Sequence, residues 1–143
     1  MSGAVGGSTT VDRLKAKVGW KGGERVTLVE AGQVRRFCEA IGDDNPRWRE
    51  EVPPTFVVAL ASETPQLPEA LDYGRGWLNG GDRFEYLEPI RVGDTVTARS
   101  TLVDVYEKQG SSGGLLFLIM ETEYVNQHGR TAVRLRGTRI RRR

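Results

Sequence analysis

The chain has 143 residues, of which 38% are hydrophobic and 28% are charged, the proportions of a single globular domain with its own core. Its formal net charge is only +2, which argues against obligatory binding to nucleic acid or to an anionic membrane. No apolar run approaches the roughly 18 residues of a membrane span, and residues 1–10 lack a secretion signal. The single cysteine, Cys38, excludes a disulfide within the chain, so we expect a cytoplasmic location.

The N-terminal part of the chain predicts little regular structure. Residues 1–10 are small and polar, so we expect a disordered lead-in before one domain that spans residues 11–143. Residues 11–18 predict a short helix, and residues 25–29 have the composition of a strand. The residues expected on the inward face of that helix are Val11, Leu14 and Val18.

An amphipathic helix is predicted at the start of residues 33–48, because four apolar residues recur at the spacing of one helical face. These four residues are Val34, Phe37, Cys38 and Ile41. Gly42 stands where a helix ends most readily, since it has no Cβ, and Pro46 follows closely. The burial expected for the apolar face makes Cys38 an inert thiol rather than a reactive one.

The turn after this helix carries three consecutive polar side chains, Asp43, Asp44 and Asn45. Two interpretations stay open: the edge of an active site, or a plain turn in which these side chains bind nearby backbone N–H groups. The residue types alone favour the plain turn. A calcium loop is not predicted, because no further acidic ligands follow at the required spacing.

A second helix is expected after two consecutive prolines. Pro54 can begin a helix, because the first turn has no partner for the missing N–H. Residues 56–62 are apolar almost all round, which predicts a helix buried on most sides. Residues 67–76 predict a loop with a turn or two of helix.

From residue 82 onward the sequence has the character of β-strands. The predicted strands span residues 83–86, 94–106, 115–120 and 131–140. The run 115–120 is continuously apolar, which predicts a central strand covered on both faces, and a hairpin turn is expected at 126–129. A short strand, two helices and then three long antiparallel strands indicate an α+β fold with the sheet packed over one apolar helix. Covering both faces of the central strand requires a second copy or a partner chain.

Histidine is the side chain that most often serves as a general base, and this chain contains only His128. It lies in the predicted hairpin turn, away from the other polar clusters, so an exposed turn residue is the favoured interpretation. Zinc sites and Ser-His-Asp arrangements lack their ligands or their base here. The sequence therefore predicts neither a metal site nor a cofactor.

Two further stretches have weaker functional interpretations. Asn79, Gly80 and Gly81 lack the Lys and Ser/Thr of a phosphate-binding loop, but two consecutive glycines let a backbone or a ligand approach closely. Residues 139–143 read RIRRR, which is typical of a solvated terminus, with contact to a substrate phosphate as the alternative.

Three segments together resemble the MaoC-type hotdog proteins, which comprise (R)-specific enoyl-CoA hydratases and 3-hydroxyacyl-thioester dehydratases. The segments read AIGDDNP, PPTF and LNGGDRFEYLEPIRVGDTV. The resemblance covers residues 20–140 and is greatest to the N-terminal, non-catalytic hotdog halves of that family. It implies a single hotdog fold, in which an antiparallel sheet wraps around a buried central helix and pairs with another into a double hotdog. It also implies a place in fatty acid metabolism.

The catalytic members of this family are known for a motif of the form G-D-x-N-P-x-H, whose Asp and His hold the water added to an enoyl thioester. Laid on this chain, the motif matches Gly42, Asp43, Asn45 and Pro46, but the position of the catalytic His is Trp48. An indole N–H donates a hydrogen bond and cannot accept a proton, so it cannot replace imidazole in acid–base catalysis. We therefore expect no catalytic residue in the chain alone, and Asp43 and Asn45 as a remnant of the motif.

The resemblance thus implies the non-catalytic, substrate-binding subunit of a heteromeric enoyl-CoA hydratase or 3-hydroxyacyl-thioester dehydratase. The substrate would be an acyl thioester of coenzyme A or of acyl carrier protein, and the partner a catalytic hotdog subunit or a second copy. The expected substrate-binding residues are Thr55, Phe56, Val57, Leu60, Asn79, Gly80 and Gly81. Two alternatives stay open: a homodimeric acyl-CoA-binding or regulatory module without chemistry, and a self-sufficient hydratase that uses Asp43.

Overall fold

The computed structural model describes residues 9–60 and 65–143. In chain order its elements are α1 (Thr10–Lys15), β1 (Arg25–Leu28), α2 (Ala31–Ile41), η1 (Pro46–Arg49), η2 (Pro54–Leu60), α3 (Glu69–Tyr73), β2 (Arg75–Tyr86), β3 (Thr95–Gly110), β4 (Gly113–Val125) and β5 (Thr131–Arg142), where η marks a 3₁₀ helix. None of the helices in the described ranges is both long and apolar enough to cross a membrane.

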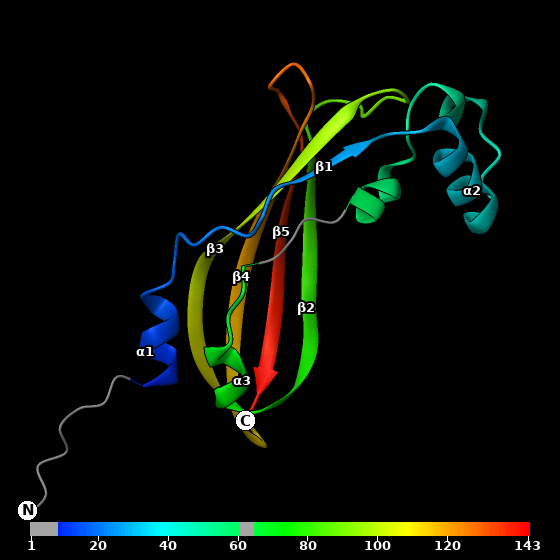
Figure 1. Ribbon diagram of the computed structural model, residues 1–143. Helices are drawn as coiled ribbons and strands as arrows, with labels where there is room; N and C mark the ends of the chain where they lie inside the picture. The colour runs from blue at the N-terminus through cyan, green and yellow to red at the C-terminus, as the bar shows by residue number, and fades with distance from the viewer. Residues whose placement is uncertain (1–8, 61–64) are drawn as a thin grey trace, which may run out of the picture.

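A five-stranded antiparallel sheet in the order β1-β3-β4-β5-β2 forms the body of the molecule. The sheet curls, and the helices gather on the face that we call the inner face, which carries Leu116, Leu118 and Tyr124 (Figure 1). At one end of this face α2 and η2 pack over a core cluster that includes Val96 and Tyr124. At the other end α1 and α3 pack over a second cluster around Leu102. This arrangement is the predicted α+β hotdog fold.

The first helix differs from its prediction at both ends. Most of the predicted lead-in, residues 1–8, lies outside the described residues, and α1 starts at Thr10 because Thr9 and Asp12 form a capping box. Leu14 is fully buried and Val11 packs partly against the second core cluster. The prediction that Val18 faces inward is wrong, since its side chain is 44% exposed and the helix ends before it.

Helix α2 confirms the predicted amphipathic pattern at three of its four apolar positions. Val34 and Cys38 are buried, and Phe37 packs partly against the core. Gly42 ends the helix in the left-handed conformation with φ of 69°, as predicted from its missing Cβ. Ile41 is 49% exposed, contrary to the prediction.

The segment that begins at Pro54 is a 3₁₀ helix of seven residues, and residues 61–62 of the predicted helix lie outside the described residues. Phe56, Val57 and Leu60 are buried, whereas Thr55 is exposed and Val58 is 58% exposed. In residues 54–60 the segment is therefore buried along one side, which corrects the prediction of burial on most sides. The apolar composition suggested burial all round, but one flank of this segment borders an open groove.

Strand β2 is longer than predicted. It begins at Arg75 rather than near residue 82, so the sheet has four long strands after the helices and not three. The first part of this strand is not predicted from the sequence, because it contains Gly76, Gly80 and Gly81 and glycine has a low strand propensity. Pairing with β5 along its whole length overrides that propensity, with irregularities in register between Arg75 and Trp77 and between Asn79 and Gly81.

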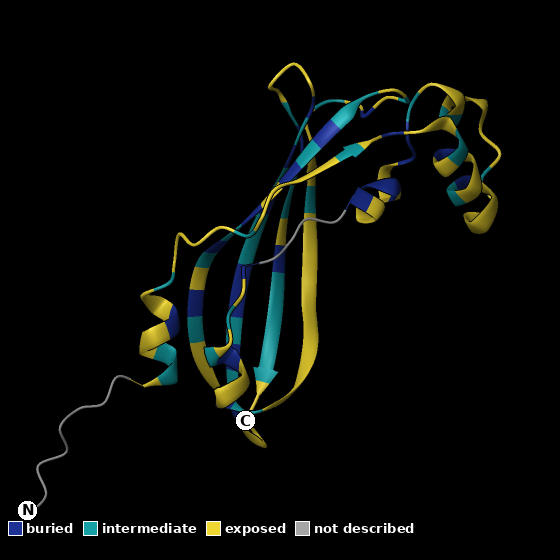
Figure 2. Cartoon of the chain, in the orientation of Figure 1, coloured by how far each residue is buried: buried dark blue, intermediate teal, exposed yellow. Residues whose placement is uncertain are grey.

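The apolar run of β4 is a central strand, as predicted, and its residues alternate between buried and partly buried over most of the run (Figure 2). Leu116 and Leu118 on the inner face are buried at 0% and 1% exposure. On the opposite face, which we call the outer face, Leu115 and Phe117 are partly buried, whereas Ile119 is 5% exposed. Tyr106 stacks on Phe117 there with 4.8 Å between ring centroids. Cover of the outer face by another chain stays a prediction.

Candidate functional site

An open groove of about 690 Å³ lies on the inner face of the sheet, between the two core clusters. Val58 and the segment from Pro65 to Leu67 border it on the helical side, and strands β2 to β5 form its floor and far wall. Its apolar lining residues are Val58, Pro65, Leu67, Trp77, Leu78, Phe84, Leu118, Met120 and Leu135. A mostly apolar hollow of this size is the usual form of a site for a small organic ligand.

A charged cluster stands on the β2 side of this groove. The guanidinium Nη1 of Arg139 lies 3.0 Å from Asp82 Oδ1 and donates to Asn79 Oδ1 at 3.2 Å. The Asn79 amide in turn donates to Asp82 Oδ2 at 3.4 Å. The arrangement depends on the bulge in β2, where Asn79 Oδ1 also accepts the backbone N–H of Gly81 at 2.8 Å. The bulge therefore aims these polar side chains into the groove.

Hydroxyl groups line the floor of the same groove. Thr122 Oγ1 donates to Ser100 Oγ at 3.2 Å, and both side chains are buried. Tyr124 is only 2% exposed, and its hydroxyl makes no hydrogen bond to any residue in the described parts of the chain. Burial, and secondarily the Asp82 carboxylate, raises the pKa of Tyr124 above its ordinary value. The groove thus combines an apolar lining with a small set of placed polar groups.

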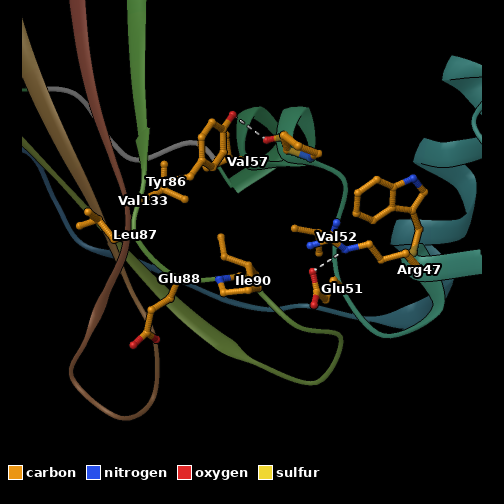
Figure 3. A pocket seen from close by; sticks show the side chains of 12 residues that line it. Arg47, Glu51, Val52, Val57, Tyr86, Leu87, Glu88, Ile90 and Val133 are labelled. Carbon is orange, nitrogen blue, oxygen red and sulfur yellow. Dashed lines mark hydrogen bonds and ion pairs between the residues drawn. The ribbon is translucent and has the colours of Figure 1, made fainter. Parts of the chain in front are cut away.

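A smaller pocket of about 260 Å³ lies where the end of β2 meets η1 and η2 (Figure 3). Val52, Val57, Ile90 and Val133 give it an apolar interior, and the Tyr86 hydroxyl donates to the Pro54 carbonyl at 3.1 Å across it. At its rim Arg47 Nε lies 3.1 Å from Glu51 Oε2. The hydrogen bond from Tyr86 ties the edge strand to the start of η2.

The acidic turn borders a third hollow of about 660 Å³ beside α2. Its polar side chains serve the backbone: Asp43 Oδ1 accepts the N–H of Asn45 at 3.1 Å, and Asn45 Oδ1 accepts the N–H of Arg47 at 3.0 Å. Asn45 is thereby the N-cap of η1. Burial, and secondarily the Asp43 carboxylate, raises the pKa of the Cys38 thiol, which disfavours a reactive thiolate.

Trp48, which the sequence led us to expect at the position of a catalytic histidine, separates two of these hollows. It lines both the 260 Å³ pocket and the 660 Å³ hollow, and its ring packs against the core cluster under α2. The indole Nε1 is buried and makes no hydrogen bond to any described residue. The Arg47 guanidinium lies 5.6 Å from the ring centroid. The side chain therefore acts as a wall and presents no base to either hollow.

The predicted substrate-binding residues are dispersed rather than gathered in one place. Asn79 lines the groove and Val57 lines the 260 Å³ pocket. Phe56 and Leu60 lie in the core, and neither they nor the exposed Thr55 lines any of the three hollows described above.

The two glycines of the predicted site are required by the backbone structure of β2. A Cβ on Gly80 would lie 2.8 Å from Thr138 Cγ2, so only glycine allows β2 to pass this close to β5. Gly81 has φ of 124°, a conformation that other residues rarely adopt.

The C-terminal arginines are only in part a solvated tail. Strand β5 runs to Arg142, and Trp77 pairs with Arg141 in the neighbouring strand. Arg139 reaches the groove, and the Arg141 guanidinium lies 5.0 Å from the centroid of the Trp77 ring. The prediction of a solvated terminus is confirmed for the exposed Arg142 and Arg143, and it is wrong for Arg139 and Arg141, which lie on the inner side of a paired strand. His128 is exposed in the β4–β5 turn, as expected from the sequence.

Sequence reasoning missed the groove residues Asp82, Ser100, Tyr124 and Arg139. They come from four different strands and share no motif. The only available clue was Arg139 within the basic run, and its partner could not be deduced from spacing.

Comparison with known proteins adds a family and a fold. Residues 16–135 match the family described as the FAS1-like dehydratase domain region. A UPF0336 protein of Thermobifida fusca (strain YX) is 32% identical over 120 residues, which cover 71% of this chain and 74% of that protein. The structure resembles the ChsH1–ChsH2 complex from Mycobacterium tuberculosis with a TM-score of 0.76, 18% identity and coverage of 92% and 88% of the two chains. It also resembles the HadBC (3R-hydroxyacyl-ACP dehydratase) complex of the same organism, with a TM-score of 0.67, 21% identity and coverage of 87% and 96%.

Proposed function

Because this chain belongs to the family of the FAS1-like dehydratase domain region, and with it to the MaoC-like hotdog proteins, we propose that it is a non-catalytic, substrate-binding subunit. The assembly would be a heteromeric enoyl-CoA hydratase or 3-hydroxyacyl-thioester dehydratase. A cytoplasmic location, expected from the sequence, belongs to the same proposal. The partner subunit supplies the acid–base pair, and this chain holds the acyl part of the thioester.

The state of Trp48 is the observation that carries this proposal. Its indole packs against the core, and the two matching polar residues of the motif, Asp43 and Asn45, are engaged by backbone N–H groups. Adding water to an enoyl thioester needs a group that gives and takes a proton, which an indole does not do. The remnant of the motif therefore supports a structural role in this chain.

The groove supports the binding part of the proposal. Its apolar lining and its volume of about 690 Å³ suit a flexible acyl chain, whose burial is favourable by about 0.8 kcal/mol for each methylene group. The groove is open at its edge, so a thioester head can extend from it toward another subunit. The carrier of the acyl group is coenzyme A or acyl carrier protein.

The free edge of the sheet supports a hotdog partner. Strand β2 stands at one end of the strand order, and every residue of it except Phe84 is exposed. Trp77, Leu78 and Tyr86 on this strand are 47%, 43% and 50% exposed, respectively. A long edge strand with exposed apolar residues is a template for pairing with another chain. Two of the similar structures are complexes by their own descriptions, ChsH1–ChsH2 and HadBC.

Hydration of crotonyl-CoA tests the proposal directly. The purified chain alone should be inactive, whereas its complex with a hotdog subunit that carries the intact Asp and His should be active. Loss of proton transfer by one catalytic group commonly lowers a rate by about 10²–10⁴-fold. In the complex, Asp43→Ala in this chain should leave the rate unchanged. Hydration by the isolated chain that Asp43→Ala abolishes would instead establish a self-sufficient hydratase.

The substitution Trp48→His tests the alignment of the motif. The imidazole introduced at position 48 should lie near the Asp43 carboxylate and feel its charge when it titrates, because both positions border the same hollow. NMR titration of this histidine, with the exposed His128 as the internal reference, checks the expectation. An imidazole that titrates like His128 would show that position 48 does not face the motif residues.

A homodimeric acyl-CoA-binding module without chemistry is the second candidate. The groove is compatible with it, and the packed Trp48 side chain suits a protein that has no catalytic role at all. Sedimentation separates the two candidates: a stable homodimer that binds acyl-CoA and enriches no other hotdog subunit on purification favours the module.

A further inference from the structure

We propose that Arg141 binds the phosphate ester of the phosphopantetheine arm that carries the acyl group, at the end of the groove that Trp77 borders. Such a site rests on the proposed function, since it holds the carrier of the same acyl thioester. Coenzyme A and acyl carrier protein share this arm and its phosphate ester. The chemistry of the site is therefore the same for both carriers.

The guanidinium group of Arg141 is held in place without an acidic partner. Its Cζ lies 5.0 Å from the centroid of the Trp77 ring, and its Nη2 donates a long hydrogen bond of 3.5 Å to the Leu71 carbonyl. Its Nε is buried and makes no hydrogen bond to any described residue. The group therefore has spare donors, and an arginine held against an aromatic ring keeps its planar fork oriented for the oxygens of a phosphate.

The neighbouring arginines of β5 differ from Arg141 in their partners. Arg139 lies two residues earlier on the same face, but its Nη1 is 3.0 Å from Asp82 Oδ1, which compensates its charge. Arg143 lies two residues later, with its guanidinium 4.9 Å from the centroid of the Tyr73 ring in α3. Within residues 9–60 and 65–143, no carboxylate forms an ion pair with Arg141 or Arg143. This end of the sheet, beside α3 and the C-terminus (Figure 1), thus attracts an anion.

The strand register sets the order of polar and apolar side chains along the groove. On the inner face, the successive pairs between β2 and β5 are Trp77–Arg141, Asn79–Arg139, Asp82–Gly137 and Phe84–Leu135. Successive pairs on one face lie about 7 Å apart where the strands are regular, because two residues of a strand span that length. From the Trp77 end, the groove therefore offers a free cation first, then polar side chains, and then an apolar pair.

A phosphopantetheine thioester has its chemical groups in the same order. Its phosphate is followed by an arm with two amide groups, and then by the sulfur and the acyl chain. The amides match the hydrogen-bonding side chains of Asn79 and Asp82, and the acyl chain matches the apolar Phe84 and Leu135. A hydrocarbon chain along the whole groove would desolvate the polar side chains without replacing their hydrogen bonds, which is unfavourable.

Calorimetric titration of the full chain, together with any hotdog subunit that purifies with it, tests the site. The probes are octanoyl-CoA, octanoyl acyl carrier protein and octanoyl-pantetheine, which has the same arm without the phosphate. At least one phosphorylated probe should bind about tenfold or more tightly than octanoyl-pantetheine, and the difference should shrink at high salt. Arg141→Gln should lower the affinity for that probe about tenfold. It should leave the affinity for octanoyl-pantetheine unchanged, which also shows that the variant folds. Arg141→Lys keeps the charge without the planar fork and should retain part of the affinity.

Arg136→Gln is the matched control, because it removes the same charge from the outer face of the same strand, where Arg136 Nη1 lies 3.5 Å from Glu121 Oε2. This variant should bind all three probes as the unaltered chain does. A carrier whose affinity falls in Arg141→Gln but not in Arg136→Gln is the carrier that the site recognises. Equal effects of the two substitutions, or no effect of either, would overturn the inference while leaving acyl binding intact. Failure of every probe to bind would overturn the proposed function, and the inference with it.

Discussion

Two polar clusters of this molecule contrast in how their side chains are used. The acidic turn at residues 43–45 is contiguous in sequence, and its Asp43 and Asn45 side chains bind N–H groups of the same turn. The groove cluster gathers Asp82, Ser100, Tyr124 and Arg139 from separate strands and faces an open hollow. The polar side chains of the turn, which matches a motif, are hydrogen-bonded to the backbone of the same turn. The groove cluster matches no motif, but it faces space in which a ligand could bind.

The residues of the acidic turn have a local reason for their presence. An Asp and an Asn that cap backbone groups stabilise a turn whether or not a reaction takes place beside them. Polar groups collected in an apolar groove have no such local reason, because each one costs desolvation. Their presence is the better indication of a ligand.

The largest expected effect is on stability, and it tests whether the core beside the acidic turn and the sheet around the groove unfold separately. Phe56 is 2% exposed and meets Phe37 of α2 edge-on, with 5.4 Å between ring centroids. Phe56→Ala should lower the free energy of unfolding by about 3–5 kcal/mol. Hydrogen exchange should rise first in α2 and η1, and least in β4 and β5 around the groove. Equal acceleration in both regions would show that they form one cooperative unit.

The next largest effect is on the pH dependence of stability, and it concerns Tyr73, whose hydroxyl donates to Glu107. Burial, followed by the hydrogen bond to Glu107, raises the pKa of Tyr73 to about 12. Because this pKa is raised above its unfolded value, the stabilisation is present below pH 10 and is lost as the pH rises from about 10 to about 12.

Tyr73→Phe should therefore cost about 1.5–3 kcal/mol at neutral pH, the usual contribution of a hydrogen bond to a charged group. It should also flatten the loss of stability between pH 10 and 12. Chemical denaturation at a series of pH values measures both. Tyr124→Phe should cost less at neutral pH, since its hydroxyl has no partner among the described residues; an equal cost would remove the contrast between the two tyrosines.

The smallest effect tests the turn itself. Asn45 caps η1 through its bond to the Arg47 N–H, so Asn45→Ala should destabilise the protein by about 1 kcal/mol. Binding of acyl-CoA in the groove should not change, because Asn45 lines a separate hollow. Asn45→Asp, which retains a capping oxygen, is the control and should recover the stability. A loss of binding in Asn45→Ala would connect the turn to the groove.

The sequence by itself determined the elements whose reasons are local. Spacing located α2, the missing Cβ of Gly42 ended it, and the apolar run 115–120 identified the central strand. The quoted segments indicated the hotdog fold, and the residue at position 48 indicated the lack of a catalytic base. Each of these depends on residues a few positions apart, where steric and hydrogen-bonding rules act directly.

Only the tertiary structure decided the extent of β2 and the position of the groove. Pairing with β5 gives strand structure to a glycine-rich segment, and the same pairing turns Arg139 and Arg141 inward. Asp82 and Arg139 meet only because their strands are neighbours at a bulge. Contacts between residues so far apart depend on strand order and register, which a single sequence does not specify.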